Sequence, residues 1–118
     1  MKVKQFRNKV LSSNSYILYL EEDNYVWVID PGDSAPLIDW IKSKNKILKG
    51  ILLTHSHADH TYGMHDLIKD FPKAKKYSSF LSIETFKSER LNGSLYVEMP
   101  FTIDSDDFIF VSEGDEVR

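Results

Sequence analysis

The chain has 118 residues, of which 42% are hydrophobic and 28% charged; this size and composition fit one globular domain and exclude a fibrous or wholly disordered protein. The formal net charge of −3 at pH 7 disfavours a nucleic-acid-binding surface, so we expect no nucleic-acid partner. Because the chain lacks cysteine, it can form neither a disulfide nor a thiolate metal site, and a bound metal must use nitrogen or oxygen ligands.

The N-terminal segment MKVKQFRNKV alternates charged residues with single apolar ones and has no continuous apolar run like that of a signal peptide. No stretch elsewhere approaches the roughly 20 apolar residues that cross a bilayer. We therefore expect a cytoplasmic location and no membrane partner.

Three strands are predicted in the first part of the chain. Residues 2–7 alternate in polarity, residues 15–20 are rich in β-branched and aromatic side chains, and residues 25–30 are almost continuously apolar. The sequence DPGD at 30–33 then predicts a sharp turn that ends the third strand.

Helices and buried strands are predicted to alternate after this turn. A short helix is expected over 34–44, with Ser34 as its cap, and a strand buried on both faces over 50–54. A second helix is expected over 64–71, because its apolar residues recur with the helical period. Those residues are Met64, Leu67, Ile68 and Phe71.

The last third of the chain predicts a helix over 79–89, an irregular segment over 91–101 and a strand over 107–111. A further strand is possible between the second and third helices. This order of elements predicts one α/β layered domain over residues 1–118.

The histidines are concentrated in one place. The chain has four, and all of them lie between residues 55 and 65. In an extended loop His55 and His57 point to the same side, and Asp59 and His60 follow at the entrance of the next helix. Such nitrogen and oxygen donors suit zinc and would also accept iron or manganese. His65 is expected on a rim or an exposed face.

A purely structural role for the other four side chains would require costly polar groups to gather at a strand end by coincidence, so we favour metal binding. Two nearby residues leave alternatives open. Asp30 is either a turn-capping residue or a hydrogen-bond acceptor for a metal-binding histidine. Tyr62 either narrows the entrance to the site or packs beside the helix start, and the second is favoured.

The segment THSHADHTYG resembles the HxHxDH signature of the metallo-β-lactamase fold superfamily, especially its glyoxalase II-like metallohydrolases. SNSYILYL, VWVIDPG, FPKAKKYSS and SEGDEVR are similar to further segments of that family. The resemblance implies the first β-sheet half, with its helices, of an αβ/βα sandwich. The 1–118 domain is therefore expected to be incomplete at its C-terminus.

The resemblance also implies the roles of the site residues. His55 and His57 would bind the first of two zinc ions, and Asp59 and His60 the second. Asp59 would also be catalytic, because it would orient a metal-bridging hydroxide and accept its proton. The implied activity is hydrolysis of a small thioester, ester or lactone.

The family completes its metal site with later histidines and an aspartate, whereas this chain has no histidine after His65. Three interpretations follow: a fragment of a complete hydrolase, which we favour, an inactive structural or interaction module, or two chains that complete one another. The missing half would leave one sheet face uncovered, which would promote self-association.

Overall fold

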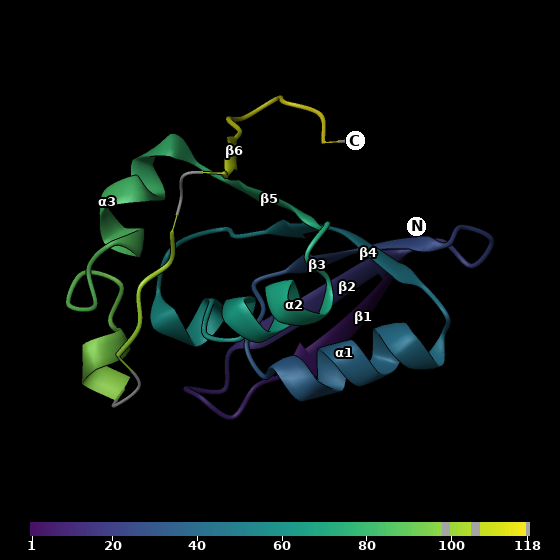
Figure 1. Cartoon of the computed structure of the whole chain (residues 1–118), viewed down its shortest axis with the longest axis horizontal. Helices are drawn as coiled ribbons and strands as arrows, with labels where there is room; N and C mark the ends of the chain where they lie inside the picture. Colours follow the sequence, from purple (N-terminus) through teal and green to yellow (C-terminus); the bar gives the residue numbers. More distant parts are fainter. Residues whose placement is uncertain (98–99, 105–106, 118) are drawn as a thin grey trace.

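The computed structural model describes residues 1–97, 100–104 and 107–117, and it contains a six-stranded sheet with two helices packed on one face (Figure 1). The strands are β1 (Lys2–Arg7), β2 (Asn14–Tyr19), β3 (Tyr25–Ile29), β4 (Ile47–Leu52), β5 (Lys75–Ser78) and β6 (Ile109–Phe110). The α-helices are α1 (Ser34–Ser43), α2 (Met64–Asp70) and α3 (Ile83–Phe86). Short 3-10 helices are η1 (Ala58–His60), η2 (Phe80–Ser82) and η3 (Ser94–Val97).

The strands lie in the sheet in chain order, from β1 to β6. β1, β2 and β3 pair antiparallel, whereas β3, β4, β5 and β6 pair parallel. Helical crossovers are what a parallel pair requires, and α1 and α2 provide them for β3–β4 and β4–β5. The prediction of an α/β layered fold is confirmed. Because β3 and β4 are parallel, the residues that follow both strands meet at one edge of the sheet.

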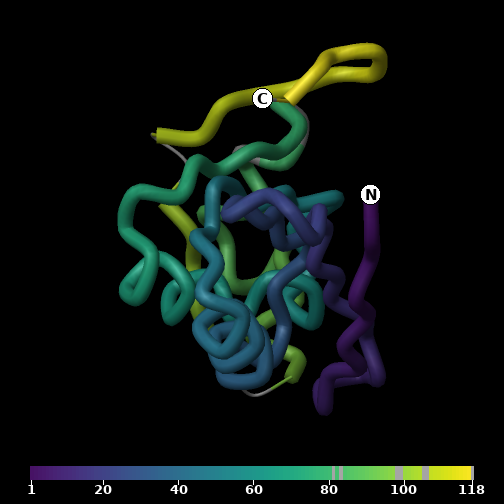
Figure 2. The backbone as a smooth tube through the Cα atoms, turned by 90° about the vertical axis from the view of Figure 1, so that its right-hand side faces the viewer, coloured from purple at the N-terminus to yellow at the C-terminus, as the bar shows by residue number. Residues whose placement is uncertain are grey.

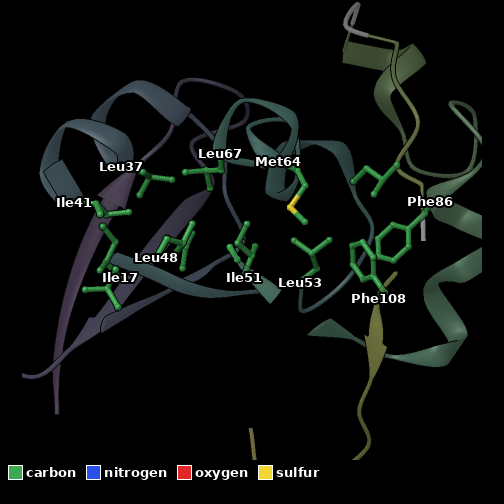
Figure 3. Close-up of a cluster of buried hydrophobic side chains, with 14 residues drawn as sticks. Ile17, Leu37, Ile41, Leu48, Ile51, Leu53, Met64, Leu67, Phe86 and Phe108 are labelled. Atoms are coloured by element: carbon green, nitrogen blue, oxygen red, sulfur yellow. The ribbon is translucent and has the colours of Figure 1, made fainter. Parts of the chain in front are cut away.

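The main core lies between the sheet and the two long helices (Figure 3). α1 buries Leu37 and Ile41, and α2 buries Met64 and Leu67, as the helical stripe over 64–71 predicts. These side chains point towards buried residues of the strands. The strand residues are Ile17, Val26, Val28, Leu48 and Ile51.

The opposite face of the sheet is less covered. Trp27, Ile29 and Leu52 alternate with the core residues of their strands and are only half-buried. The segment after β6, yellow in Figure 2, lies on the side away from α1, and its Asp115 and Val117 line a hollow of about 310 Å³ with these side chains. The expected open face is therefore partly covered by the chain's own last residues.

Several predicted boundaries differ from the structure. The helix expected over 79–89 is shorter in the structure: η2 and α3 follow one another over 80–86, and at the last of these residues the Phe86 carbonyl accepts a hydrogen bond from Ile103 N at 2.9 Å. Ser34 does not cap α1: the cap position is Asp33, and Ser34 Oγ donates to Asp66 Oδ2 at 2.9 Å.

The remaining differences concern the strands and the 91–101 segment. β4 begins at Ile47 instead of 50, and the last strand is restricted to Ile109–Phe110. The segment expected to be irregular contains η3. In the described part of the chain, no helix has the length and apolar character needed to cross a bilayer.

Candidate metal centre

The histidine loop begins where β4 leaves the sheet. Leu53 N still donates a hydrogen bond to Tyr77 O of β5 at 2.9 Å. The next amide, Thr54 N, donates instead to Asp30 Oδ1 at 2.8 Å. His57 is extended, with φ −62° and ψ 137°, and η1 follows as a tight turn in which His60 N donates to His57 O at 3.0 Å. Because an extended residue is followed directly by a tight turn, the side chains in the segment 55–60 come close to one another.

Three imidazole rings and one carboxylate meet in this loop. The ring centroid of His55 lies 4.7 Å from that of His57 and 4.3 Å from that of His60. Asp59 Oδ2 lies 3.4 Å from His60 Nε2. The structure therefore places the ring of His55 beside the rings of His57 and His60, and the carboxylate of Asp59 beside His60.

His65 lies apart from this cluster. It is exposed on α2, and its Nε2 lies 2.9 Å from the carbonyl oxygen of Thr102. Its ring also packs edge-on against Phe101, with centroids 6.2 Å apart. The prediction that His65 occupies an exposed face is confirmed.

Asp30 lies behind the cluster, directly after β3. Its side chain is almost fully buried, and its backbone has the left-handed φ of 52°, which is uncommon for a residue other than glycine. The carboxylate accepts hydrogen bonds from Thr54 N at 2.8 Å and Thr54 Oγ1 at 2.5 Å, and it lies 3.3 Å from His60 Nδ1. Of the two alternatives for Asp30, the structure shows the acceptor beside a histidine.

This contact orients the His60 ring. When Nδ1–H donates to Asp30, the lone pair of Nε2 is free on the side of Asp59. Asp59 Oδ2 lies 3.4 Å from this Nε2, so the two atoms would be available as ligands of one ion.

Among the described residues, the donor atoms that all lie within 4.8 Å of one another belong to Asp30, His55 and His60, and those of His57 and Asp59 are not part of this group. Burial lowers the pKa of His55 from its ordinary value of 6.5, and the nearby His60 lowers it further. A lowered pKa keeps the imidazole neutral near pH 7, as a metal ligand must be. The donor set thus fits a divalent metal bound by nitrogen and oxygen.

A close backbone contact holds the histidine loop against the Asp30 turn. Gly63 N donates to Pro31 O at 3.0 Å, and a Cβ at Gly63 would lie 2.0 Å from the carbonyl oxygen of Gly32. Only glycine therefore allows the chain after η1 to pack this closely on the turn after β3. This contact keeps Asp30 next to His60.

Tyr62 packs beside the start of the helices, as the favoured alternative expects. Its hydroxyl donates to Asp33 Oδ1, and it lines a groove of about 390 Å³ with Lys9, Pro36 and Asp66. Burial, and then the hydrogen bond to Asp33, raise the pKa of the Tyr62 phenol above its ordinary value. None of the residues at 55–60 lines that groove.

Two further contacts hold the loop, and sequence reasoning missed both. Ser13 Oγ, before β2, donates to Asp59 O at 2.6 Å. Ala58 N donates to Asn92 O, also at 2.6 Å. Both partners are distant in sequence, and isolated serine and asparagine residues carry no signal that would have identified them.

The family model described as the Metallo-beta-lactamase superfamily matches residues 8–117 of the chain. The chain belongs to the metallo-beta-lactamase superfamily. The resemblance drawn from THSHADHTYG is thereby confirmed, and the observed sheet and helices are those of this superfamily's fold.

Curated relatives include hydroxyacylglutathione hydrolases. The enzyme of Aeromonas salmonicida (strain A449) is 40% identical over 65 residues, which are 55% of this chain and 26% of that protein. The enzyme of Legionella pneumophila (strain Lens) is 42% identical over 66 residues, which are 47% and 26% of the two chains. The chain thus spans about a quarter of the length of these relatives.

Solved structures match over almost the whole chain. BLEG-1 B3 metallo-beta-lactamase has a TM-score of 0.86 and 26% identity, and the match covers 99% of this chain and 56% of that one. The structure of TTHA1623 in a di-iron-bound form has a TM-score of 0.76 and 22% identity, with 97% and 56% coverage. The second likeness, at this identity, shows the fold alone.

Proposed function

We propose that this chain provides the metal-binding part of a metal-dependent hydrolase that acts on a small thioester, with small esters or lactones as related substrates. The observation that carries the proposal is the cluster of His55, His57, Asp59 and His60 at the carboxyl end of β4, with Asp30 behind it. In α/β folds this end of the strands is where ligands bind.

In this proposal His55 and His57 hold one metal, and Asp59 and His60 hold a second. Bound metal ions would act as Lewis acids and would lower the pKa of a coordinated water. Asp59 would orient the attacking water and accept its proton, and Ser13 would fix the Asp59 backbone. Water adds to the thioester carbonyl, the C–S bond breaks, and the departing thiolate takes up a proton.

The thioester preference rests on the relatives. Two hydroxyacylglutathione hydrolases are 40% and 42% identical over the matched segments. We propose zinc as the metal, because histidine and carboxylate donors suit it, although iron also accepts such ligands. A small-molecule substrate and a cytoplasmic location belong to the same proposal.

The test is thiol release from a hydroxyacylglutathione thioester by the 118-residue chain supplied with zinc. Asp59→Asn keeps the shape of the side chain but removes the proton acceptor, so we expect a loss of about 10²–10⁴-fold in rate. Asp66→Asn is the matched control, since Asp66 lies exposed on α2. No thiol release from the wild-type chain, or equal rates in both variants, would overturn the proposal.

A second candidate follows from the number of donors. A catalytic zinc usually has about three protein ligands and one open position, whereas the pairs His55–His57 and Asp59–His60 provide two each. An inactive metal-binding module, or a site completed by a second copy, is therefore the alternative. Bound zinc without any thiol release would favour the inactive module, and activity that rises with dimer concentration would favour pairing.

A further inference from the structure

One end of the sheet carries more than half of the chain's basic residues. The helices α1 and α2 both end there and the strands β4 and β5 begin there, in the segments 42–49 and 69–76 (Figure 1). These segments contain eight of the 15 basic residues but only one of the 18 acidic ones, Asp70. The eight are Lys42, Lys44, Lys46, Lys49, Lys69, Lys73, Lys75 and Lys76. We call this surface the lysine end.

The two segments of the lysine end lie side by side. Lys42 Nζ lies 3.0 Å from Asp70 Oδ2, and Gly50 of β4 is paired with Lys75 of β5. β4 begins at the lysine end and leads to the histidine loop, so the length of a strand separates this surface from the proposed metal ligands. The lysine end is therefore distinct from the candidate metal centre.

Most of these lysines have no carboxylate partner in the part of the chain that the structure describes. Lys42 pairs with Asp70 and Lys76 with Asp107, and Lys46 Nζ donates to backbone carbonyls of the loop between β2 and β3. The other five are Lys44, Lys49, Lys69, Lys73 and Lys75. The ends of α1 and α2 attract lysines, but each helix end contributes only about half a negative charge. Two helix ends cannot offset five lysines, so the surface keeps a positive charge.

An apolar hollow of about 210 Å³ opens between the two segments of the lysine end. Its lining residues are Ile47, Leu48, Phe71, Pro72, Lys73 and Ala74. Ile47 is 53% exposed, although it is a large apolar residue in a strand. A cavity of about 150 Å³ already holds a benzene ring, so this hollow has room for one large apolar side chain.

The combination of hollow and lysines distinguishes between classes of anionic partner. Membrane-bound proteins push projecting apolar residues into the bilayer, whereas the apolar side chains here line a concave surface. A nucleic-acid base has polar edges, and a hollow lined almost wholly by apolar side chains offers them no hydrogen bonds. A leucine or phenylalanine side chain that projects from an acidic peptide fits both the hollow and the charge around it.

We propose that the lysine end binds an acidic segment of a partner protein, with one leucine or phenylalanine of that segment in the hollow. Ile47 and Phe71 hold this anchor, and the unpaired lysines contact the Glu and Asp side chains that flank it. The surface lies away from the metal centre, so the proposal does not depend on the hydrolase activity.

The test is a titration of a fluorescein-labelled peptide, GEELEEG, with the 118-residue chain, followed by fluorescence anisotropy. Replacing the peptide leucine by alanine should weaken binding about tenfold, because less apolar surface enters the hollow. Raising NaCl from about 0.1 M to about 1 M shortens the Debye length from about 10 Å to about 3 Å, so binding should weaken about tenfold or more.

Two variants of the chain separate the contributions of charge and hollow. Lys73→Glu reverses a charge beside the hollow and should weaken binding roughly tenfold. Ile47→Ala should weaken it about threefold, and only for the leucine peptide. Lys87→Glu is the matched control, because Lys87 is an exposed lysine that follows α3, outside both segments. It should leave the affinity unchanged.

Several results would overturn the proposal. They are no binding of the leucine peptide, equal affinity for the leucine and alanine peptides, or an equal loss in Lys87→Glu. Displacement of the peptide by phosphatidylglycerol vesicles or single-stranded RNA at lower concentration would do the same, since the preferred partner would then belong to another class. Thiol release and zinc content should be the same in Lys73→Glu as in the wild-type chain, so the two proposals fail separately.

Discussion

The strongest prediction concerns Asp30→Asn, which changes one oxygen of the carboxylate to an amide nitrogen and keeps the shape of the side chain. Asparagine tolerates the left-handed backbone that residue 30 adopts, with its φ of 52°, so the turn should survive. The remaining oxygen can still accept from Thr54 N, but the new NH₂ faces two groups that now serve as donors. These are Thr54 Oγ1, at 2.5 Å, and His60 Nδ1, at 3.3 Å.

Two effects follow, one on stability and one on metal binding. The lost acceptor for the Thr54 hydroxyl, in a site where Asp30 is almost fully buried, should lower the free energy of unfolding by about 1–3 kcal/mol. The amide would also donate to His60 Nδ1, which moves the ring proton to Nε2 and removes the lone pair that faces Asp59. Loss of such a supporting contact typically weakens metal binding about 10–100-fold.

The assay is calorimetric titration of zinc into wild-type and variant chains, with the His60 tautomer read from its ring 15N shifts. Asp33→Asn is the matched control, because Asp33 lies on the same turn but contacts Lys9 N and Tyr62 instead of a histidine. Wild-type zinc affinity in Asp30→Asn, or an equal loss in Asp33→Asn, would refute the role assigned to Asp30.

Three other changes test the surrounding structure. Gly63→Ala should lower the free energy of unfolding by about 1–3 kcal/mol, measured in urea, because its Cβ would meet a backbone oxygen at 2.0 Å; an unchanged midpoint would contradict this. Tyr62→Phe should cost about 1 kcal/mol through the lost bond to Asp33 and leave zinc affinity unchanged. The metal-free chain should lose stability as the pH falls below about 6.5, since the unfolded state protonates His55 more readily than the folded state does; His55→Gln should flatten that slope.

Local patterns were sufficient for the elements that place the site. The stripe from Met64 to Phe71 identified α2, and the apolar run before Thr54 identified the strand that delivers the histidines, because burial imposes these periods directly. The helix expected over 79–89 is present but shorter, over 80–86, and it ends where a non-local contact is made. The amide of Ile103 donates a hydrogen bond to the carbonyl oxygen of Phe86, and nothing in the sequence around residue 86 reveals that contact.

The candidate site divides in the same way. Its donors lie within six consecutive residues, so their spacing alone selected His55, His57, Asp59 and His60. The groups that hold them come from distant segments: Asp30 through a strained backbone, and Ser13 and Asn92 through single hydrogen bonds. Parallel pairing of β3 with β4 creates the first of these contacts, and pairing between distant strands is not encoded in local periodicity.

The central claim is that the loop after β4 binds metal, and the most direct measurement is the zinc content per chain of the purified protein by elemental analysis. We expect about one to two tightly held ions in the wild-type chain. His57→Ala should lose a large part of this zinc, whereas His65→Ala should keep it, since His65 lies outside the cluster. A wild-type chain without zinc, or the same content in His57→Ala, would contradict the account.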